Sequence, residues 1–269
     1  MSLKISVLLE NHLAKESHNC SPLISRPGLS LLIEDGQDRL LFDTGPDDSF
    51  LKNALNMGID LSTLTATLLS HGHYDHCGGI PWLPEKTRII CHPAISQPRF
   101  AALAFAGIKA KFKKLSVDVD YSRFIQEPTS TPVNISSRFI WSGEISTPSP
   151  KAYGVLGDPA QSTDYIQDEG VLIYKSAQGL VIITGCGHKG IINIVRHCQN
   201  ITGITRIHAI VGGLHLRSAS PWALWKIRRF LRKEKPTYIF ACHCTGWWGK
   251  LWLPSLHSPA TGEVVIIPE

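Results

Sequence analysis

Residues 70–79 decide the fold of this chain, and they read Ser-His-Gly-His-Tyr-Asp-His-Cys-Gly-Gly. Four of their side chains can bind a metal ion and stand within six consecutive positions: His71, His73, Asp75 and His76. The apolar run just before them, residues 63–69, is typical of a buried strand. Nitrogen and oxygen ligands must converge to about 2.0–2.2 Å from a cation, and a loop at a strand end can deliver them. The stretch therefore predicts a metal site.

The spacing within this loop favours two metal ions. In an extended or tight loop, His71 and His73 point to one side, while Asp75 and His76 can turn toward a second point nearby. Hydrolytic sites with two metal ions use this arrangement. The alternative is a polar surface loop with chance histidines, and the Gly78-Gly79 pair and the preceding strand both disfavour it.

Composition limits the class of protein. The 269 residues suffice for one large α/β domain or two small ones, and no apolar run is long enough to cross a membrane. No export signal pattern opens the chain. The formal charge of +5 is modest, and its densest cluster lies at 226–235. We expect a solvated helix face there and no nucleic-acid partner, although an anionic ligand at this face remains the alternative.

The cysteines indicate a reducing compartment. Their number, seven, is odd, and their spacing is not that of a small disulfide-stabilised domain. Four of them stand beside histidine motifs: Cys77, Cys186, Cys242 and Cys244. We therefore expect thiols near a metal site and a cytoplasmic location.

The first part of the chain predicts strands around the loop. Residues 30–34 and 39–43 form the arms of a hairpin with an Asp-Gly turn between them. Asp43-Thr44-Gly45 ends the second arm, where Asp43 can orient a histidine ligand or, alternatively, cap the following turn. A helix is expected over 48–57, and a strand over 88–93 ends near His92, which is either structural or close to the site.

The middle section, residues 94–165, is the least regular. Its pattern over 101–114 predicts a lid-like helix, and 128–132 is rich in turn residues. Long irregular sections in an α/β chain often carry binding loops, so we expect this variable section to shape the substrate site.

The second half repeats one pattern, in which an apolar strand is followed by a glycine-flanked turn with histidine or cysteine. A hairpin over 170–184 leads to Cys186 and His188, a strand over 207–211 leads to His215, and a strand over 238–241 leads to His243. Helices are expected over 191–198 and 221–233, and a closing strand over 263–267. If the strand ends of both halves meet at one edge, all these side chains share one cleft.

At this point the chain resembles the metallo-β-lactamase superfamily. Residues 71–76 match its H-x-H-x-D-H signature, and Asp43-Thr44-Gly45 resembles its strand-end D-T-G. The resemblance implies one domain over 1–269 with a four-layered αβ/βα sandwich, in which two mixed sheets pack face to face with helices outside. Residues 184–188, 212–216 and 243–246 are similar to one group, the "metal-dependent hydrolases of superfamily II". Its archaeal members include synthases that join a dihydropterin to an aminobenzene ribose phosphate with loss of pyrophosphate.

The chain also departs from the superfamily's commoner pattern. The usual third histidine of the first metal is missing before the second hairpin, and Asp164, Asp168 or Glu169 could substitute for it. At the bridging position, either a Cys186 thiolate, which favours zinc, or His188, which needs no thiol to lose its proton, is expected as ligand. We prefer His188. His243 matches the terminal ligand, and His215 either serves the substrate or is structural.

These expectations lead to a metal-dependent hydrolase with one or two divalent ions, zinc first, with manganese, iron or magnesium also open. Water activated by the metal would attack a phosphoester, ester or lactone of a small, anionic substrate. Asp75 would hold that water at the second metal, and His215 would protonate the leaving group. The alternatives are a transferase acting on a dihydropterin-methyl pyrophosphate, a nuclease of the same superfamily, and a non-catalytic metal-binding module. The oligomeric state is left open.

Overall fold

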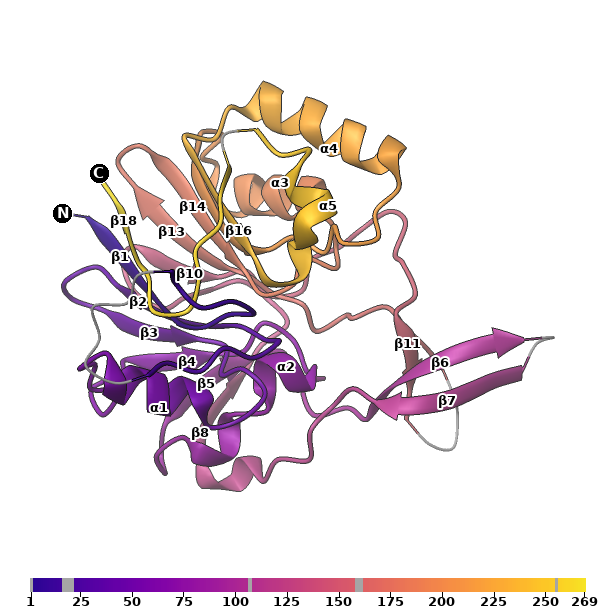
Figure 1. Ribbon diagram of the computed structural model, residues 1–269, viewed down its shortest axis with the longest axis horizontal. Coiled ribbons are helices and arrows are strands. Elements are labelled where there is room, and N and C mark those ends of the chain that lie inside the picture. Colours follow the sequence, from indigo (N-terminus) through magenta and orange to yellow (C-terminus); the bar gives the residue numbers. More distant parts are fainter. Residues whose placement is uncertain (1, 16–21, 106–107, 158–161, 255) are drawn as a thin grey trace.

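The computed structural model describes residues 2–15, 22–105, 108–157, 162–254 and 256–269, with side chains left out over 103–109. Two seven-stranded sheets pack face to face, with helices on their outer sides (Figure 1). The expected four-layered αβ/βα sandwich is therefore confirmed.

The first sheet has the strand order β18-β1-β2-β3-β4-β5-β8. Its strands are β1 (Leu3–Leu9), β2 (Ser30–Glu34), β3 (Arg39–Phe42), β4 (Ala66–Leu68), β5 (Arg88–Cys91), β8 (Ile125–Pro128) and β18 (Val264–Ile267). Strands β2 and β3 form the expected hairpin, and β3, β4, β5 and β8 run parallel. Strand β18, from the far end of the chain, pairs antiparallel with β1.

The second sheet has the order β17-β16-β15-β14-β13-β10-β9. Its strands are β9 (Val133–Asn134), β10 (Phe139–Trp141), β13 (Leu172–Ser176), β14 (Gly179–Thr184), β15 (Ile207–Gly213), β16 (Tyr238–Cys242) and β17 (Leu256–His257). Strands β14 to β17 run parallel, so the loops that follow them emerge at one edge.

The helices cover the outer faces of the two sheets. Helix α1 (Ser49–Asn56) packs on the first sheet, while α3 (Ile191–Thr202) and α4 (Pro221–Glu234) pack on the second. Two short helices, α2 (Tyr74–Cys77) and α5 (Gly246–Lys250), lie within loops. One-turn 3-10 helices occur at Ile80–Trp82, Tyr121–Arg123 and His243–Thr245.

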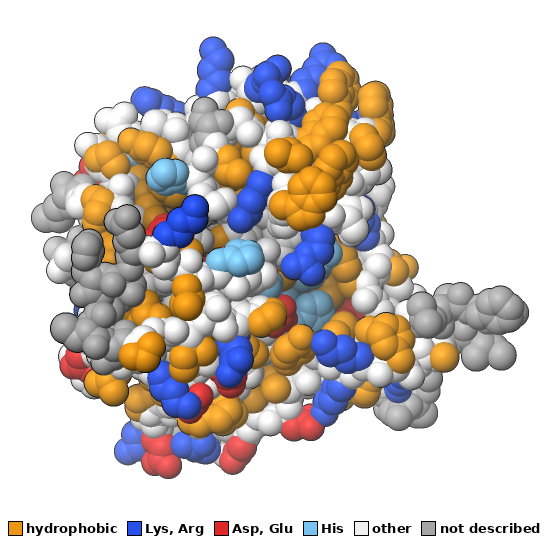
Figure 2. All heavy atoms as spheres, viewed as in Figure 1, with side chains coloured by type: hydrophobic (Ala, Val, Ile, Leu, Met, Phe, Trp, Pro, Cys, Tyr) orange, Lys and Arg blue, Asp and Glu red, His pale blue; other side chains and the backbone are white. Residues whose placement is uncertain are grey.

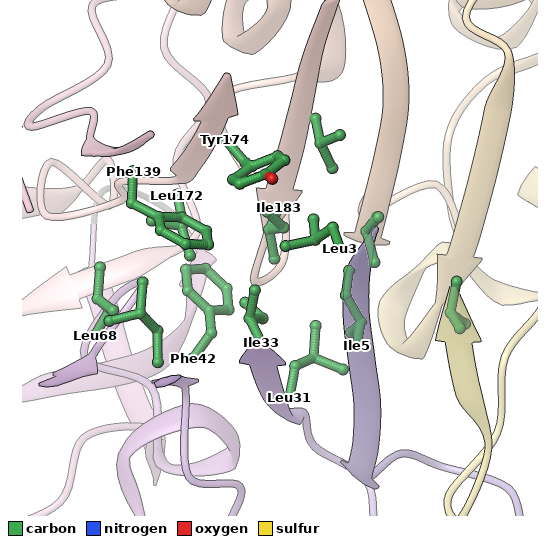
Figure 3. Packing of buried hydrophobic residues seen from close by; sticks show 14 of the residues in the cluster. Leu3, Ile5, Leu31, Ile33, Phe42, Leu68, Phe139, Leu172, Tyr174 and Ile183 are labelled. Atoms are coloured by element: carbon green, nitrogen blue, oxygen red, sulfur yellow. The ribbon is translucent and has the colours of Figure 1, made fainter. Parts of the chain in front are cut away.

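Alternating side chains produce these layers. Along β2, Leu31 and Ile33 enter the core between the sheets, whereas Leu32 faces the outer layer with α1. Successive strand side chains point to opposite faces, so a strand that is apolar at every position can serve two cores. Figure 3 shows side chains of both sheets, among them Phe42 and Tyr174, pointing toward one another.

A third, four-stranded sheet replaces the lid-like helix expected over 101–114, so that prediction is wrong. The sheet has the order β12-β11-β6-β7 and consists of β6 (Arg99–Phe105), β7 (Ile108–Lys114), β11 (Gly154–Leu156) and β12 (Ser162–Asp164). The β7 sequence, Ile-Lys-Ala-Lys-Phe-Lys-Lys, alternates apolar and basic residues with the period of a strand. This sheet, which we call the arm, projects from the body of the molecule (Figure 1).

The outer surface of α4 is both aromatic and basic. Trp222 is 61% exposed and stacks on Trp225 with ring centroids 4.8 Å apart, and Lys226 and Arg229 lie over these rings. Figure 2 shows hydrophobic and basic side chains gathered over α4 at the top right. Over the stretches described, the helices are all too short or too polar to cross a membrane.

Candidate metal centre

The loops that follow β4, β14, β15 and β16 meet between the two sheets and bring the expected ligands together. Strand β4 leads to His71 and His73, and α2 carries Asp75 and His76. Strand β14 leads to Cys186 and His188, and β16 leads to His243. All of these loops leave the carboxyl ends of parallel strands, the usual place for a ligand site in α/β sheets.

One group of ligand atoms consists of His71, Cys186 and His188, whose donor atoms lie within 4.8 Å of one another. His73 adjoins this group, because its Nδ1 lies 3.1 Å from Nε2 of His71. Nε2 of His73 is buried and has no hydrogen-bond partner among the described residues. A buried ring nitrogen without a partner is costly, and a bound cation would satisfy it.

A second group consists of His76, Cys186 and His243. Nε2 of His76 lies 3.1 Å from Sγ of Cys186 and 3.2 Å from Nε2 of His243. An oxygen of Asp75 lies 3.5 Å from the same nitrogen of His243. Cys186 thus belongs to both groups, and the structure brings both Cys186 and His188 to the centre.

Two carboxylates contact the Nδ1 atoms of histidine rings in this centre. Oδ2 of Asp43 accepts a hydrogen bond from Nδ1 of His76 at 2.6 Å, and Asp43 also accepts from the backbone and hydroxyl of Ser70. Oε1 of Glu169 lies 2.9 Å from Nδ1 of His188. Such partners fix the orientation of an imidazole and leave Nε2 for a metal ion.

Two further ring contacts were not expected from the sequence. Nδ1 of His243 lies 2.9 Å from Oδ1 of Asn11, while Oε1 of Glu10 accepts a hydrogen bond from the backbone of His243. Nδ1 of His71 lies 2.9 Å from the Ser70 hydroxyl. The polar end of β1 was the only sequence signal for Glu10 and Asn11.

The acids proposed to replace the missing histidine belong to neither ligand group. Arg99 forms ion pairs of 2.7 Å with Asp164 and Asp168, and Asp168 also accepts a hydrogen bond from the backbone of Gly72. Glu169 contacts His188 instead of lying among the ligand atoms. His188 lies beside His71 instead, with ring centroids 4.7 Å apart.

Two other histidines lie outside both groups. The ring of His215 is 4.6 Å from that of His188 and 5.1 Å from that of Tyr153, so it borders the centre from one side. His92 has its Nε2 3.8 Å from Glu144, away from the ligand atoms. A φ of 49° places His215 in the left-handed region, which is uncommon for a residue other than glycine.

Burial sets the charge of the centre. It lowers the pKa of His71, His73, His188 and His243 well below the usual value, so these rings are neutral and able to bind a metal. Burial also opposes the charge on His76, but the neighbouring Asp43 and Asp75 raise its pKa to about 9. Burial raises the pKa of the Cys186 thiol.

These residues fit the binding of divalent metal ions. Imidazole nitrogens, a carboxylate and a shared sulfur form a mixed donor set of the kind that suits zinc. Metal binding would also give a partner to the buried Nε2 of His73, which has none among the described residues.

The family model of the metallo-beta-lactamase superfamily matches residues 24–144. Together with the sheet order and the ligand loops, this match makes residues 24–144 similar to the metallo-β-lactamase superfamily, whose members use divalent metal ions.

Several relatives align with most of the chain. An uncharacterized protein of Methanocaldococcus jannaschii is 28% identical over 271 residues, covering 97% of each chain. The 7,8-dihydropterin-6-methyl-4-(beta-D-ribofuranosyl)-aminobenzene-5'-phosphate synthase of the same organism is 29% identical, covering 91% of this chain and 88% of the synthase. The crystal structure of Tm1679, a metal-dependent hydrolase of the beta-lactamase superfamily, superposes with a TM-score of 0.84 at 25% identity and covers 98% of each chain.

Proposed function

We propose that this protein is a metal-dependent hydrolase with a dinuclear centre, zinc first, acting on a phosphoester, ester or lactone of a small anionic molecule. The observation that carries the proposal is the position of Cys186, whose sulfur belongs to both groups of ligand atoms. One group would consist of His71, His73 and His188, and the other of Asp75, His76 and His243. Bound ions of this kind lower the pKa of a water molecule toward about 7 and polarise the substrate oxygen.

The residues of the chain supply the remaining parts of the mechanism. Asp75 lies on the His243 side, where its carboxylate can accept a hydrogen bond from the attacking water and orient it. His215 borders His188 on the cavity side, and we assign to it proton transfer to the leaving group. Tyr153 supports this wall, because its hydroxyl donates a hydrogen bond to the backbone oxygen of His188.

A transferase is the second candidate, and the aligned archaeal synthase favours it. In that case an organic nucleophile replaces water, and pyrophosphate leaves a dihydropterin-methyl group. The same ligand residues serve both reactions, so the choice depends on the substrate cavity. The described cysteines are free thiols, which supports a place in the reducing cytoplasm.

The ligand assignment is tested by His73→Ala, with His257→Ala on the exposed strand β17 as the control. We expect the native protein and the control to hold two zinc ions per chain by elemental analysis. His73→Ala should lose metal from its group and lose activity. Full metal content and full activity in His73→Ala would refute the assignment.

The two reactions are separated by assaying the zinc-loaded protein on two substrate sets. Turnover of model phosphodiesters, esters or lactones supports hydrolysis. Inertness toward these, with consumption of a dihydropterin-methyl pyrophosphate in the presence of an aminobenzene ribose phosphate, supports the transferase.

A further inference from the structure

A cavity of about 140 Å³ opens beside the candidate metal centre. Its walls include His188 and His215, the loop that carries Thr147, Ser149 and Lys151, and an apolar side formed by residues of α4 and of the segment before it. The volume is close to that of an engineered cavity of about 150 Å³ that admits a benzene ring. It therefore has room for one functional group of a substrate and the carbon atoms attached to it.

Lys189 is the unusual residue in this wall. It is only 8% exposed, yet in the described part of the chain its ammonium forms no ion pair and no hydrogen bond. The nearby carboxylate of Glu169 is already occupied by the backbone N–H groups of residues 188 and 189 and by the ring of His188. Burial lowers the pKa of Lys189, while the carboxylates of Glu169 and Glu144 act on its ammonium from a distance without pairing with it. An anion in the cavity would therefore give this ammonium a direct partner.

The rest of the cavity also favours an anion. None of its lining residues is acidic, and Lys151 adds a second ammonium. Helix α3 begins at this wall, with Gly190 at its N-cap, no capping side chain and no acid in its first turn. The N-terminus of a helix carries a partial positive charge that attracts anions.

We propose that this cavity binds a phosphate group that the substrate carries away from the reacting bond, with Lys189 as its buried counterion. Two ammonium groups and a helix terminus match a dianion better than a singly charged carboxylate. The apolar side, which includes Leu216, Ala223 and Ile227, takes the adjoining organic part. The inference rests on the proposed function, because the cavity borders the metal-binding His188.

The test uses the zinc-loaded protein, inorganic phosphate as the probe and calorimetry as the measurement. Lys189→Met should weaken phosphate binding at least tenfold, Lys151→Met should weaken it less, and Lys189→Arg should largely retain it. Lys233→Met, on the outer side of α4, is the control. Acetate should bind more weakly than phosphate and depend less on Lys189.

Zinc content and the melting temperature show whether Lys189→Met keeps its fold. With phosphate absent, the variant should melt at or above the native temperature, because an unpaired buried charge has been removed. Unchanged phosphate affinity in a folded, zinc-loaded Lys189→Met protein would overturn the proposal. Equal affinities for acetate and phosphate would contradict the proposed preference of the cavity for a doubly charged phosphate group. If the native, zinc-loaded protein bound phosphate but turned over none of the substrates of either set, the proposed function would be rejected while the phosphate site would stand.

Discussion

Asp43 shows how one carboxylate organises the centre. Its two oxygens accept hydrogen bonds from the backbone N–H and the hydroxyl of Ser70 and from Nδ1 of His76. The backbone φ of Asp43 is 58°, which lies in the left-handed region. Such strain persists only where surrounding contacts hold it, as the hydrogen bonds do here.

We predict that Asp43→Asn lowers zinc affinity about 10–100-fold, because outer partners of metal-binding histidines have effects of this size. The asparagine amide has the shape of the carboxylate, but its single oxygen cannot accept all three hydrogen bonds. Competition with a chromogenic chelator measures the affinity. Asp47→Asn, nearer the surface, is the control, and equal affinities in both variants would contradict the assigned role.

Protons should leave the protein when the metal binds. Without metal, the pKa of His76 is about 9 and that of the Cys186 thiol is higher still, so both groups hold a proton at pH 7. Metal binding needs both deprotonated. We predict the release of at least two protons per dinuclear centre at pH 7, one each from His76 and Cys186, and an affinity that rises as pH increases toward 9.

Calorimetry in buffers with different ionisation enthalpies measures this release. Cys186→Ser should release about one proton fewer, because the serine hydroxyl stays protonated. An apparent enthalpy that is independent of the buffer would disprove the prediction.

Sequence reasoning named the side chains that the structure brings together, because each stands in a local pattern that follows an apolar strand. It could not identify their supports, since those contacts are not local. Glu10 and His243 are 233 positions apart and meet only because β1 and β16 lie in sheets that pack together. Glu169 was one of three acids considered as a substitute for the missing histidine, since sequence cannot distinguish a ligand from its supporting carboxylate.

At the scale of elements, the arm is tied to the metal loop by Arg99. This residue starts β6, is almost fully buried, and pairs with Asp164 of β12 and with Asp168, which holds the backbone of Gly72. The expected helix failed here because a hairpin of alternating residues is stabilised by cross-strand pairing, which a helical pattern search does not consider.

We predict that Arg99→Met lowers the free energy of unfolding by about 3–5 kcal/mol, because it leaves two carboxylates buried without their partner. Arg88→Met is the matched control. It breaks a pair with Glu127 that is partly open to solvent, so it should cost about 1 kcal/mol or less. Urea denaturation measures both values, and similar losses in the two variants would contradict the prediction.

At the scale of the whole molecule, the two sheets share the centre. The first supplies His71, His73, Asp75 and His76, and the second supplies Cys186, His188 and His243. A bound ion is therefore expected to link the sheets and to stabilise the native state through mass action.

We predict that removing zinc lowers the free energy of unfolding by about 2.7 kcal/mol per site when free zinc had stood at about 100 times Kd. Denaturation with and without a chelator measures the difference. His73→Ala should show a smaller difference. Equal curves for native protein with and without chelator would argue against a site that spans the sheets.

The pairing of β18 with β1 has a consequence for biosynthesis. The four-ligand loop leaves the ribosome long before Cys186 and His243 are made, and the first sheet gains its β18 edge only when residues 264–267 arrive. During translation the nascent chain thus carries imidazoles and a carboxylate without the sulfur. The side chains of both groups of ligand atoms can therefore come together only after β14 and β16 of the second sheet have been made.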